Sequence, residues 1–258
     1  MTRLLRCLVE YDGTAFAGFQ RQLGRATVQG ALESAIGSVT REEVLVVGAG
    51  RTDAGVHAIG QVVHFKTESA LPMPVLERAV NANLPPAARI RELEEADPAF
   101  HARFSALSRE YRYLVENAAV ASPLLRARTY HVPGDLDVGL MNEAAAALCG
   151  SHDFVAFGRP MVYTRQGTDP SEEIEVVGGT VRTMYHATCW RRARFVQFCF
   201  VADAFLRHMV RMLIGTLLRI GNGSLVKRAI ALILAGDRSI VAGPAVPAHG
   251  LYLVRVRY

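Results

Sequence analysis

The sequence predicts an α+β fold in which the order β-α-β-β-α-β occurs twice along the chain. Segments with apolar residues at helical spacing alternate with short runs, rich in branched residues, that are typical of strands. The order of these segments in the first hundred residues repeats in the rest of the 258-residue chain. We therefore expect two pseudo-duplicated ferredoxin-like halves, residues 1–104 and 105–258, with antiparallel sheets and a central cleft.

Three local signals mark the elements of the first half. Asp12-Gly13 is a turn pair that closes an apolar run, and Thr27 is typical of a helix N-cap, with apolar residues at helical spacing behind it. Pro74 suits the first turn of a helix. In chain order we expect a strand at 3–11, a helix at 28–39, strands at 43–48 and 60–66, a helix from Pro74 that ends before Pro85-Pro86, and a strand near 89–96.

The second half repeats this order with additions. We expect a strand at 108–116, a helix at 137–148, strands near 174–189 and 194–202, a helix from about 204 to 221, a helix at 225–235 capped by Ser224, and a closing strand at 250–258. The stretch 157–172 shows no periodicity, which predicts a mobile loop.

Charge restricts the class of protein only mildly. Lys plus Arg number 29 against 24 acidic residues, a net charge of +5. Nearly all basic residues are Arg, with Lys only at Lys66 and Lys227. Arg favours bidentate contacts with phosphate, but Arg-rich codon usage explains the same bias equally well. The composition is therefore compatible with a polyanionic partner without requiring one.

Cysteine usage and hydropathy predict a cytoplasmic protein. The four cysteines are Cys7, Cys149, Cys189 and Cys199. They show neither zinc spacing nor a disulfide framework, and the N-terminus lacks a secretory signal. The most apolar stretch, 204–220, contains four basic residues, Arg207, His208, Arg211 and Arg219. Such charges exclude a membrane span.

The most unusual segment is GAGRTDAGVHAIGQVVHF, residues 48–65. Small residues surround Arg51 and Asp53, so the backbone there is able to approach a bulky partner closely. A dinucleotide-binding loop would need Gly at position 53, and a phosphate-binding P-loop would need Lys after Gly55. Both are excluded. By composition alone, an Asx-turn at Asp53 is the simpler interpretation.

The complete sequence of this segment closely resembles the catalytic motif of the TruA family of tRNA pseudouridine synthases. Further matches follow in the family's order: YDGTAFAGFQRQ (11–22), VQGALESAI (28–36), NANLP (81–85), FHARFSA (100–106), REYRY (109–113), HDFVAF (152–157), AFLRHMVRMLIG (204–215) and GLYLVRV (250–256). The resemblance therefore covers nearly the whole chain.

The resemblance implies four site residues. The family's nucleophilic aspartate falls on Asp53, and the loop arginine that helps displace the target nucleotide falls on Arg51. The tyrosine that contacts the substrate falls on Tyr111. The arginine that pairs with the catalytic carboxylate falls on Arg211. The first half would thus carry the catalytic loop and the second half would complete the cleft.

Three of these roles have alternatives in the residues themselves. Arg51 serves equally well as a plain phosphate contact. The segment around Arg211 is rich in basic residues, so a solvated basic face is possible there. Tyr111 and Tyr113 share one strand face, so one of them is able to line the site while the other packs.

The reaction implied is the isomerisation of uridine in the anticodon arm of tRNA, at the neighbouring positions 38, 39 and 40. A stacked base must first be extruded before an enzyme reaches it. Three routes stay open for Asp53: attack on the ribose, attack on the uracil ring, or removal of a ribose proton. The family also implies a homodimer.

No cofactor or metal is expected, because the isomerisation exchanges neither electrons nor phosphate. His57, His64 and His101 lack metal-ligand spacing, so we expect packing or hydrogen-bonding roles for them. Two rival functions are weaker. A non-catalytic RNA-binding module would show an RNP aromatic run, and a sugar hydrolase would normally pair Asp53 with a second carboxylate.

Overall fold

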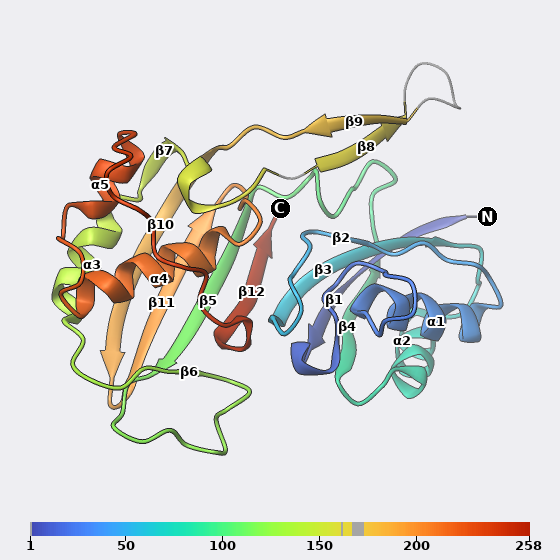
Figure 1. Cartoon of the computed structure of the whole chain (residues 1–258). Helices are drawn as coiled ribbons and strands as arrows, with labels where there is room; N and C mark the ends of the chain where they lie inside the picture. The colour runs from blue at the N-terminus through green and yellow to red at the C-terminus, as the bar shows by residue number, and fades with distance from the viewer. Residues whose placement is uncertain (1, 161, 167–172) are drawn as a thin grey trace. The chain divides into compact units, whose positions relative to one another are not determined.

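The computed structural model describes residues 2–160, 162–166 and 173–258. It is a mixed α/β structure with a large open sheet (Figure 1). The chain divides into two compact units. The first contains Met1–Tyr113, Ser122–Thr129 and Ala248–Tyr258, and the second contains Leu114–Ala121 and Tyr130–Pro247.

The described elements follow in this order along the chain: β1 (Arg3–Tyr11), α1 (Val28–Thr40), β2 (Val47–Gly48), β3 (His57–Thr67), α2 (Met73–Asn83), β4 (Ala88–Glu95), β5 (Ser108–Glu116), β6 (Tyr130–His131), α3 (Val138–Ala146), β7 (Gly150–Asp153), β8 (Val162–Gln166), β9 (Glu173–Val177), β10 (Val181–Arg192), β11 (Phe195–Ala202), α4 (Met209–Gly221), α5 (Ala229–Leu234) and β12 (Leu251–Arg257). Short 3₁₀ turns lie at Gly13–Ala15, Val155–Phe157 and Ala248–Gly250.

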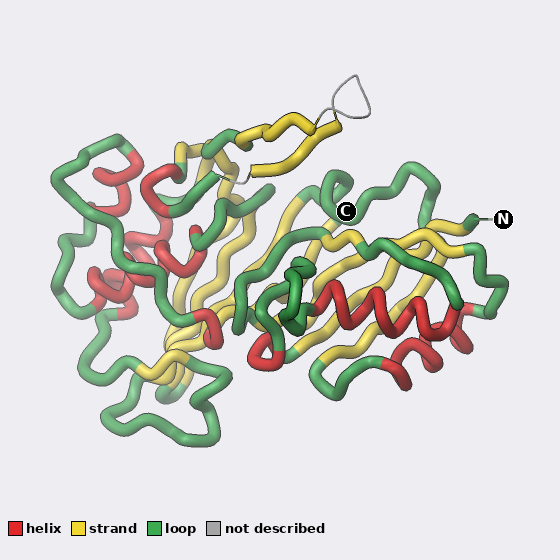
Figure 2. The backbone as a smooth tube through the Cα atoms, turned by 45° about the vertical axis from the view of Figure 1, so that its right-hand side comes forward, coloured by secondary structure: helices red, strands yellow, loops and turns green. Residues whose placement is uncertain are grey.

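In the first unit the strand order is β4-β1-β3-β12-β5, with β2 paired to β3. Strand β1 is antiparallel to both β3 and β4, whereas β12 is parallel to β3 and antiparallel to β5. Helices α1 and α2 lie side by side on one face of this sheet (Figures 1 and 2). Strand β12 therefore lies between β3 and β5, which precede it by more than a hundred residues along the chain.

The first helix forms where its cap and its spacing predict it. Thr27 Oγ1 accepts a hydrogen bond from the Gly30 backbone N–H at 3.3 Å, which satisfies one of the donors left unpaired at a helix N-terminus. Val28, Leu32 and Ile36 are fully buried on the face toward the sheet. The predicted N-cap and helix are confirmed.

In the second unit β10 pairs with β11 and β7, and α3 packs against β10 and α4. Strands β8 and β9 form a separate two-stranded sheet. Helix α4 carries a long apolar stripe in which Leu213, Ile214 and Leu217 are fully buried. Among the described residues, no helix combines the length and apolar composition that a membrane span needs.

Several sequence predictions about element ends are wrong. The segment 43–48 is a strand only at Val47–Gly48. Helix α4 begins at Met209, five residues later than predicted, because His208 adopts a left-handed backbone with φ 65°. Arg207 precedes the helix, where its backbone pairs with that of Arg159.

The remaining differences lie in the second unit. Helix α5 is preceded by Arg228 as N-cap and not by Ser224. The strand predicted near 174–189 is two strands, β9 and β10. Part of the predicted 157–172 loop is strand β8, while residues 161 and 167–172 lie outside the described residues.

Candidate active site

Asp53 lies in the loop of residues 49–56 between β2 and β3, called the Asp53 loop below. Arg51 is exposed, Thr52 is buried and Asp53 is half-buried. The Val56 N–H donates to the Asp53 carbonyl at 3.1 Å, and Gly55 at the turn has φ 81°. The tight turn thus requires glycine at position 55 and leaves the carboxylate side chain partly accessible.

A buried hydrogen bond anchors the middle of the Asp53 loop. The hydroxyls of Thr52 and Tyr11 are 2.7 Å apart, and both residues are buried. Burial raises the pKa of Tyr11 to about 12, so its hydroxyl keeps its proton. On the other side, the buried Gln61 side chain donates to the Gly50 carbonyl at 2.7 Å. The loop is therefore fixed to β1 and β3 immediately before Asp53.

The segment after β1 also packs directly on the Asp53 loop. The Phe19 N–H donates to the Thr52 carbonyl at 3.1 Å. Gly18 has φ 102°, and a Cβ atom there would lie 2.9 Å from the Thr52 carbonyl oxygen and 3.3 Å from the Ala54 nitrogen. Both the backbone angle and the close approach therefore require glycine at position 18.

Tyr111 on β5 belongs to the same surroundings as Asp53. It is 8% exposed, and burial together with the nearby Tyr11 and Asp53 raises the pKa of its phenol. Tyr113 is fully buried beside Leu251 of β12. The structure thus brings Asp53, Arg51 and Tyr111 into one unit, and the charge of Asp53 acts on the phenol of Tyr111.

Arg109, at the start of β5, links the Asp53 loop to the segment before β5. Its Nη2 donates to the Ala49 carbonyl at 3.0 Å and to the Arg103 carbonyl at 2.7 Å. The Arg103 charge, together with burial as the larger effect, lowers the pKa of Arg51. The Arg103 charge therefore acts on Arg51 within the Asp53 loop.

Arg211 lies in the second unit, in the first turn of α4. Its Nε donates to the Val246 carbonyl at 2.6 Å, and its own carbonyl accepts from the Val246 N–H at 3.3 Å. These contacts hold the half-buried side chain in one orientation.

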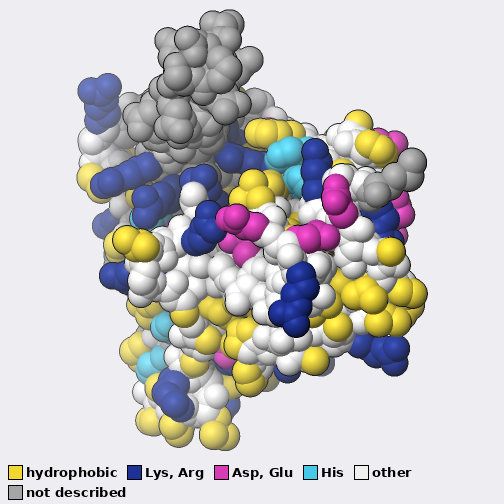
Figure 3. All heavy atoms as spheres, turned by 90° about the vertical axis from the view of Figure 1, so that its right-hand side faces the viewer, with side chains coloured by type: hydrophobic (Ala, Val, Ile, Leu, Met, Phe, Trp, Pro, Cys, Tyr) yellow, Lys and Arg dark blue, Asp and Glu magenta, His cyan; other side chains and the backbone are white. Residues whose placement is uncertain are grey.

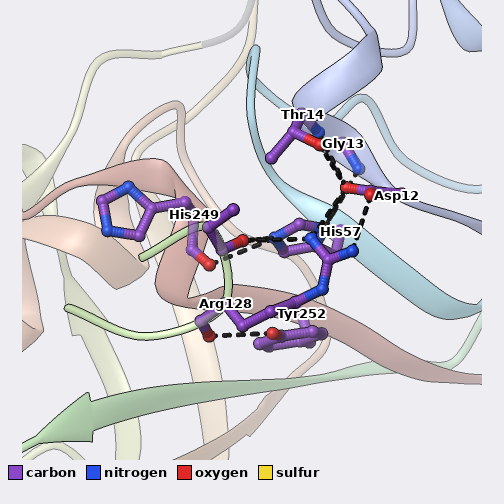
Figure 4. Close-up of polar contacts among 8 residues, drawn as sticks. Asp12, Gly13, Thr14, His57, Arg128, His249 and Tyr252 are labelled. Atoms are coloured by element: carbon purple, nitrogen blue, oxygen red, sulfur yellow. Dashed lines mark hydrogen bonds and ion pairs between the residues drawn. The ribbon is translucent and has the colours of Figure 1, made fainter. Parts of the chain in front are cut away.

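A second polar cluster supports the end of the Asp53 loop at the start of β3 (Figure 4). Arg128 donates two hydrogen bonds to the Asp12 carboxylate, at 2.9 and 2.6 Å. Burial opposes ionisation of Asp12, but the bonds from Arg128 and Thr14 outweigh it and hold the pKa of the carboxyl well below its usual range. The ion pair ties residues Ser122–Thr129 to the turn after β1.

His57 occupies the centre of this cluster and is buried. Its Nδ1 accepts from the Gly13 N–H at 3.0 Å, so its Nε2 donates to the carbonyls of Ala127 and His249, at 3.0 and 3.1 Å. Burial and the Arg128 charge lower the pKa of His57, which favours this neutral form. The expected hydrogen-bonding role of His57 is confirmed.

The described residues contain no group of three or more His, Cys, Asp or Glu side chains arranged to bind a metal ion.

Comparison with known families gives a direct match. The sequence profile of a family described as tRNA pseudouridine synthase matches residues 7–105 and 144–258. The chain belongs to this family. The match includes the Asp53 loop, Tyr111 lies in the gap between its two parts, and Arg211 lies in the second part.

Relatives named tRNA pseudouridine synthase A match the chain along nearly its full length. The protein from Chloroflexus aurantiacus is 45% identical over 99% of this chain and 89% of its own. The relative from Geobacillus kaustophilus is 42% identical over 100% of this chain and 95% of its own. That from Acetivibrio thermocellus is 40% identical over 99% and 100%. The chain thus corresponds to the whole length of a pseudouridine synthase relative.

Sequence reasoning did not assign the residues that support the site of this pseudouridine synthase family member. Tyr11, Gln61 and Arg109 all lie inside segments that resemble the family, yet nothing local distinguishes them from core or surface residues. Their partners are 41, 11 and 60 residues away along the chain. Only the pairing of distant strands reveals what they contact.

We predict that Tyr11 and Thr52 are energetically coupled through their hydrogen bond. Tyr11→Phe and Thr52→Val each remove one hydroxyl and leave the other buried without this partner, so the single changes together should cost more than the double change. Urea unfolding of the four proteins should give a coupling energy of about 1 kcal/mol. Additive effects of the two changes would contradict this anchor.

Proposed function

We propose that this protein converts uridine to pseudouridine in the anticodon arm of tRNA, with Asp53 as the catalytic carboxylate. The observation that carries the proposal is the half-buried Asp53 in a loop fixed by buried contacts, whose charge contributes to the raised pKa of the buried Tyr111. Membership of the pseudouridine synthase family supports the reaction. The names of relatives from several bacteria support tRNA as the substrate.

The chemistry of the isomerisation explains why one positioned carboxylate is enough to catalyse it. The bond from uracil nitrogen to the ribose breaks, the base turns, and its 5-carbon bonds to the same anomeric carbon. The 5-carbon then loses its proton and the freed ring nitrogen gains one. Reactant and product contain the same atoms in the same oxidation state, so we propose that the reaction uses no cofactor. Asp53 acts in its ionised form as nucleophile or base. Attack on the ribose, attack on the ring and removal of a ribose proton remain the three candidate routes.

We propose that Arg51 and Tyr111 contact the target nucleotide. Arg51 is an exposed residue of the Asp53 loop, where its guanidinium is available either to fill the space left in the stack or to bind a phosphate. Tyr111 offers a ring for stacking and a hydroxyl that keeps its proton because its pKa is raised. Its position near the Asp53 charge supports a contact with the reacting base.

Arg211 is proposed to pair with the Asp53 carboxylate and to keep it ionised. The proposal rests on the resemblance of its segment to the family. The fixed orientation of its guanidinium on the Val246 carbonyl is consistent with a positioning role.

A basic surface supports a polyanionic substrate. On the face drawn in Figure 3, Lys and Arg side chains gather toward the upper left of the view and stand more sparsely elsewhere. The net charge of +5 has the same sign. Such charge favours association with RNA phosphates.

The proposal also covers the domain architecture, the target positions in tRNA, the oligomeric state and the cellular compartment. We propose two ferredoxin-like halves, 1–104 and 105–258, supported by the orders β1-α1-β2-β3-α2-β4 and β5-α3-β10-β11-α4-β12 with insertions. Positions 38 to 40 as targets and the homodimer follow from the family resemblance. Four cysteines without a disulfide among the described residues are compatible with action in the cytoplasm, where tRNA is processed.

Asp53→Asn should abolish pseudouridine formation and leave the Kd for tRNA within about threefold, because the change removes the ionised carboxylate and almost no contact area. Asp97→Asn is the matched control, since Asp97 is an exposed acid in a turn of the same unit. The measurement is pseudouridine mapping on tRNA after single turnover. Residual turnover within about tenfold of wild type would exclude Asp53 as the catalytic residue.

Arg211→Ala should lower the single-turnover rate by about a hundredfold, the range for loss of a charge that stabilises a reacting group. Arg207→Ala should lower it less than about fivefold, because Arg207 is exposed and precedes α4. Equal losses at the two positions would instead indicate a general phosphate-binding surface.

Arg51→Ala should slow the chemical step at saturating enzyme, because the extruded nucleotide would no longer be replaced in the stack. Arg238, an exposed arginine of the second unit, provides the control. Its loss should change at most the salt dependence of tRNA affinity, by about one phosphate contact. A wild-type single-turnover rate for Arg51→Ala would reduce Arg51 to a phosphate contact.

A further inference from the structure

Phe104 presents an aromatic ring to solvent next to the Asp53 loop. Its exposed fraction is 77%, and it lies in a hydrogen-bonded turn, residues 101–105. His101 Nδ1 accepts hydrogen bonds from the N–H groups of Arg103 and Phe104, at 3.2 and 3.3 Å. The Ser105 N–H donates to the His101 carbonyl at 2.9 Å. The turn therefore fixes the backbone from which the Phe104 ring projects.

Two neighbouring side chains define the surroundings of the ring. The His101 ring lies with its centroid 4.4 Å from that of Phe104. The guanidinium of Arg103 lies 5.7 Å from the ring centroid, within cation–π distance. An exposed aromatic ring beside a guanidinium is the combination that single-stranded nucleic acid uses, because bases stack on the ring and phosphates bind the cation.

The turn is connected to the catalytic loop by a single side chain. Arg109 donates from one nitrogen to the carbonyls of Arg103 and Ala49. Arg51 lies close enough for its pKa to be lowered by the Arg103 charge. A molecule bound at Phe104 would therefore lie beside the loop that presents Asp53.

Charge favours RNA over a protein partner at this place. A single exposed apolar side chain is ordinary on a protein surface, and Leu107 is another nearby, 66% exposed. Arg103, however, places a positive charge beside Phe104, and this charge also acts on Arg51 in the Asp53 loop. An anion is the partner that relieves their mutual repulsion.

We propose that Phe104 and Arg103 form a subsite for a nucleotide of the substrate RNA that flanks the target uridine. The ring stacks the base and the Arg103 guanidinium contacts a phosphate. This inference rests on the proposed function for the identity of the RNA, but its test reads binding separately from chemistry.

The test compares variants that change only the exposed ring. Phe104→Ala should raise the Kd for an anticodon-arm RNA by about five- to a hundredfold, the range for loss of one stacked base. Phe104→Leu keeps apolar area without an aromatic face and should lose nearly as much, whereas Phe104→Trp should retain wild-type affinity. Leu107→Ala is the matched control and should leave the Kd unchanged. Urea unfolding midpoints of all variants should agree.

A spectroscopic readout reports stacking directly. The wild-type chain contains one tryptophan, Trp190. The additional fluorescence in Phe104→Trp should be quenched when the anticodon-arm RNA is added. Arg103→Gln should reduce the slope of log affinity against log salt by about one contact.

Three outcomes would overturn the subsite. An RNA Kd within twofold of wild type for Phe104→Ala would remove the stacking role, and wild-type affinity for Phe104→Leu would show that only apolar area matters. A change in oligomeric state for Phe104→Ala, with unchanged RNA affinity per protomer, would assign the ring to a contact between copies of the chain. If wild-type protein binds the RNA through Phe104 yet makes no pseudouridine, the subsite stands and the proposed function fails.

Discussion

The buried hydrogen bond between Tyr11 and Thr52 is the constraint on which the candidate site depends. It connects the end of β1 to the residue immediately before Asp53. Both hydroxyls are buried. Removing one leaves the other without this hydrogen bond in the protein interior, where the loss lowers the free energy of unfolding. Gln61 fixes Gly50 in the same way from β3. The sheet thereby determines the backbone position from which a partly exposed carboxylate projects.

Small residues and one long side chain complete this arrangement in different ways. Gly18 lets a neighbouring segment come within van der Waals distance of the Thr52 carbonyl. Arg109 acts over a longer range, because its guanidinium reaches the backbone of both the Asp53 loop and the turn that carries Phe104. Close backbone packing determines the shape of the Asp53 loop. Arg109 holds the turn that carries Phe104 next to this loop.

Much of the fold was predictable because its signals are local. The Thr27 cap and the apolar spacing behind it predicted α1, and the branched run at 3–11 predicted β1. The start of α4 was not predictable, since the apolar pattern continues through residues that the left-handed His208 excludes from the helix. The supporting contacts of the Asp53 loop depend on strands far apart in sequence. The roles of four residues stay predictions: Asp53, Arg51, Tyr111 and Arg211. They rest on the resemblance of the sequence to family motifs, because residue spacing alone does not indicate a role.

The position of β12 has a consequence for synthesis on the ribosome. This strand is the last in the chain, yet it pairs with both β3 and β5 inside the first unit. Domains usually fold as they emerge, the N-terminal part first. Here the first unit lacks an interior strand until Leu251–Arg257 has been synthesised, and the pairing edges of β3 and β5 stay open until then. A ribosome that stops before Leu251 therefore releases a chain whose N-terminal unit, which supports Asp53, has never been completed.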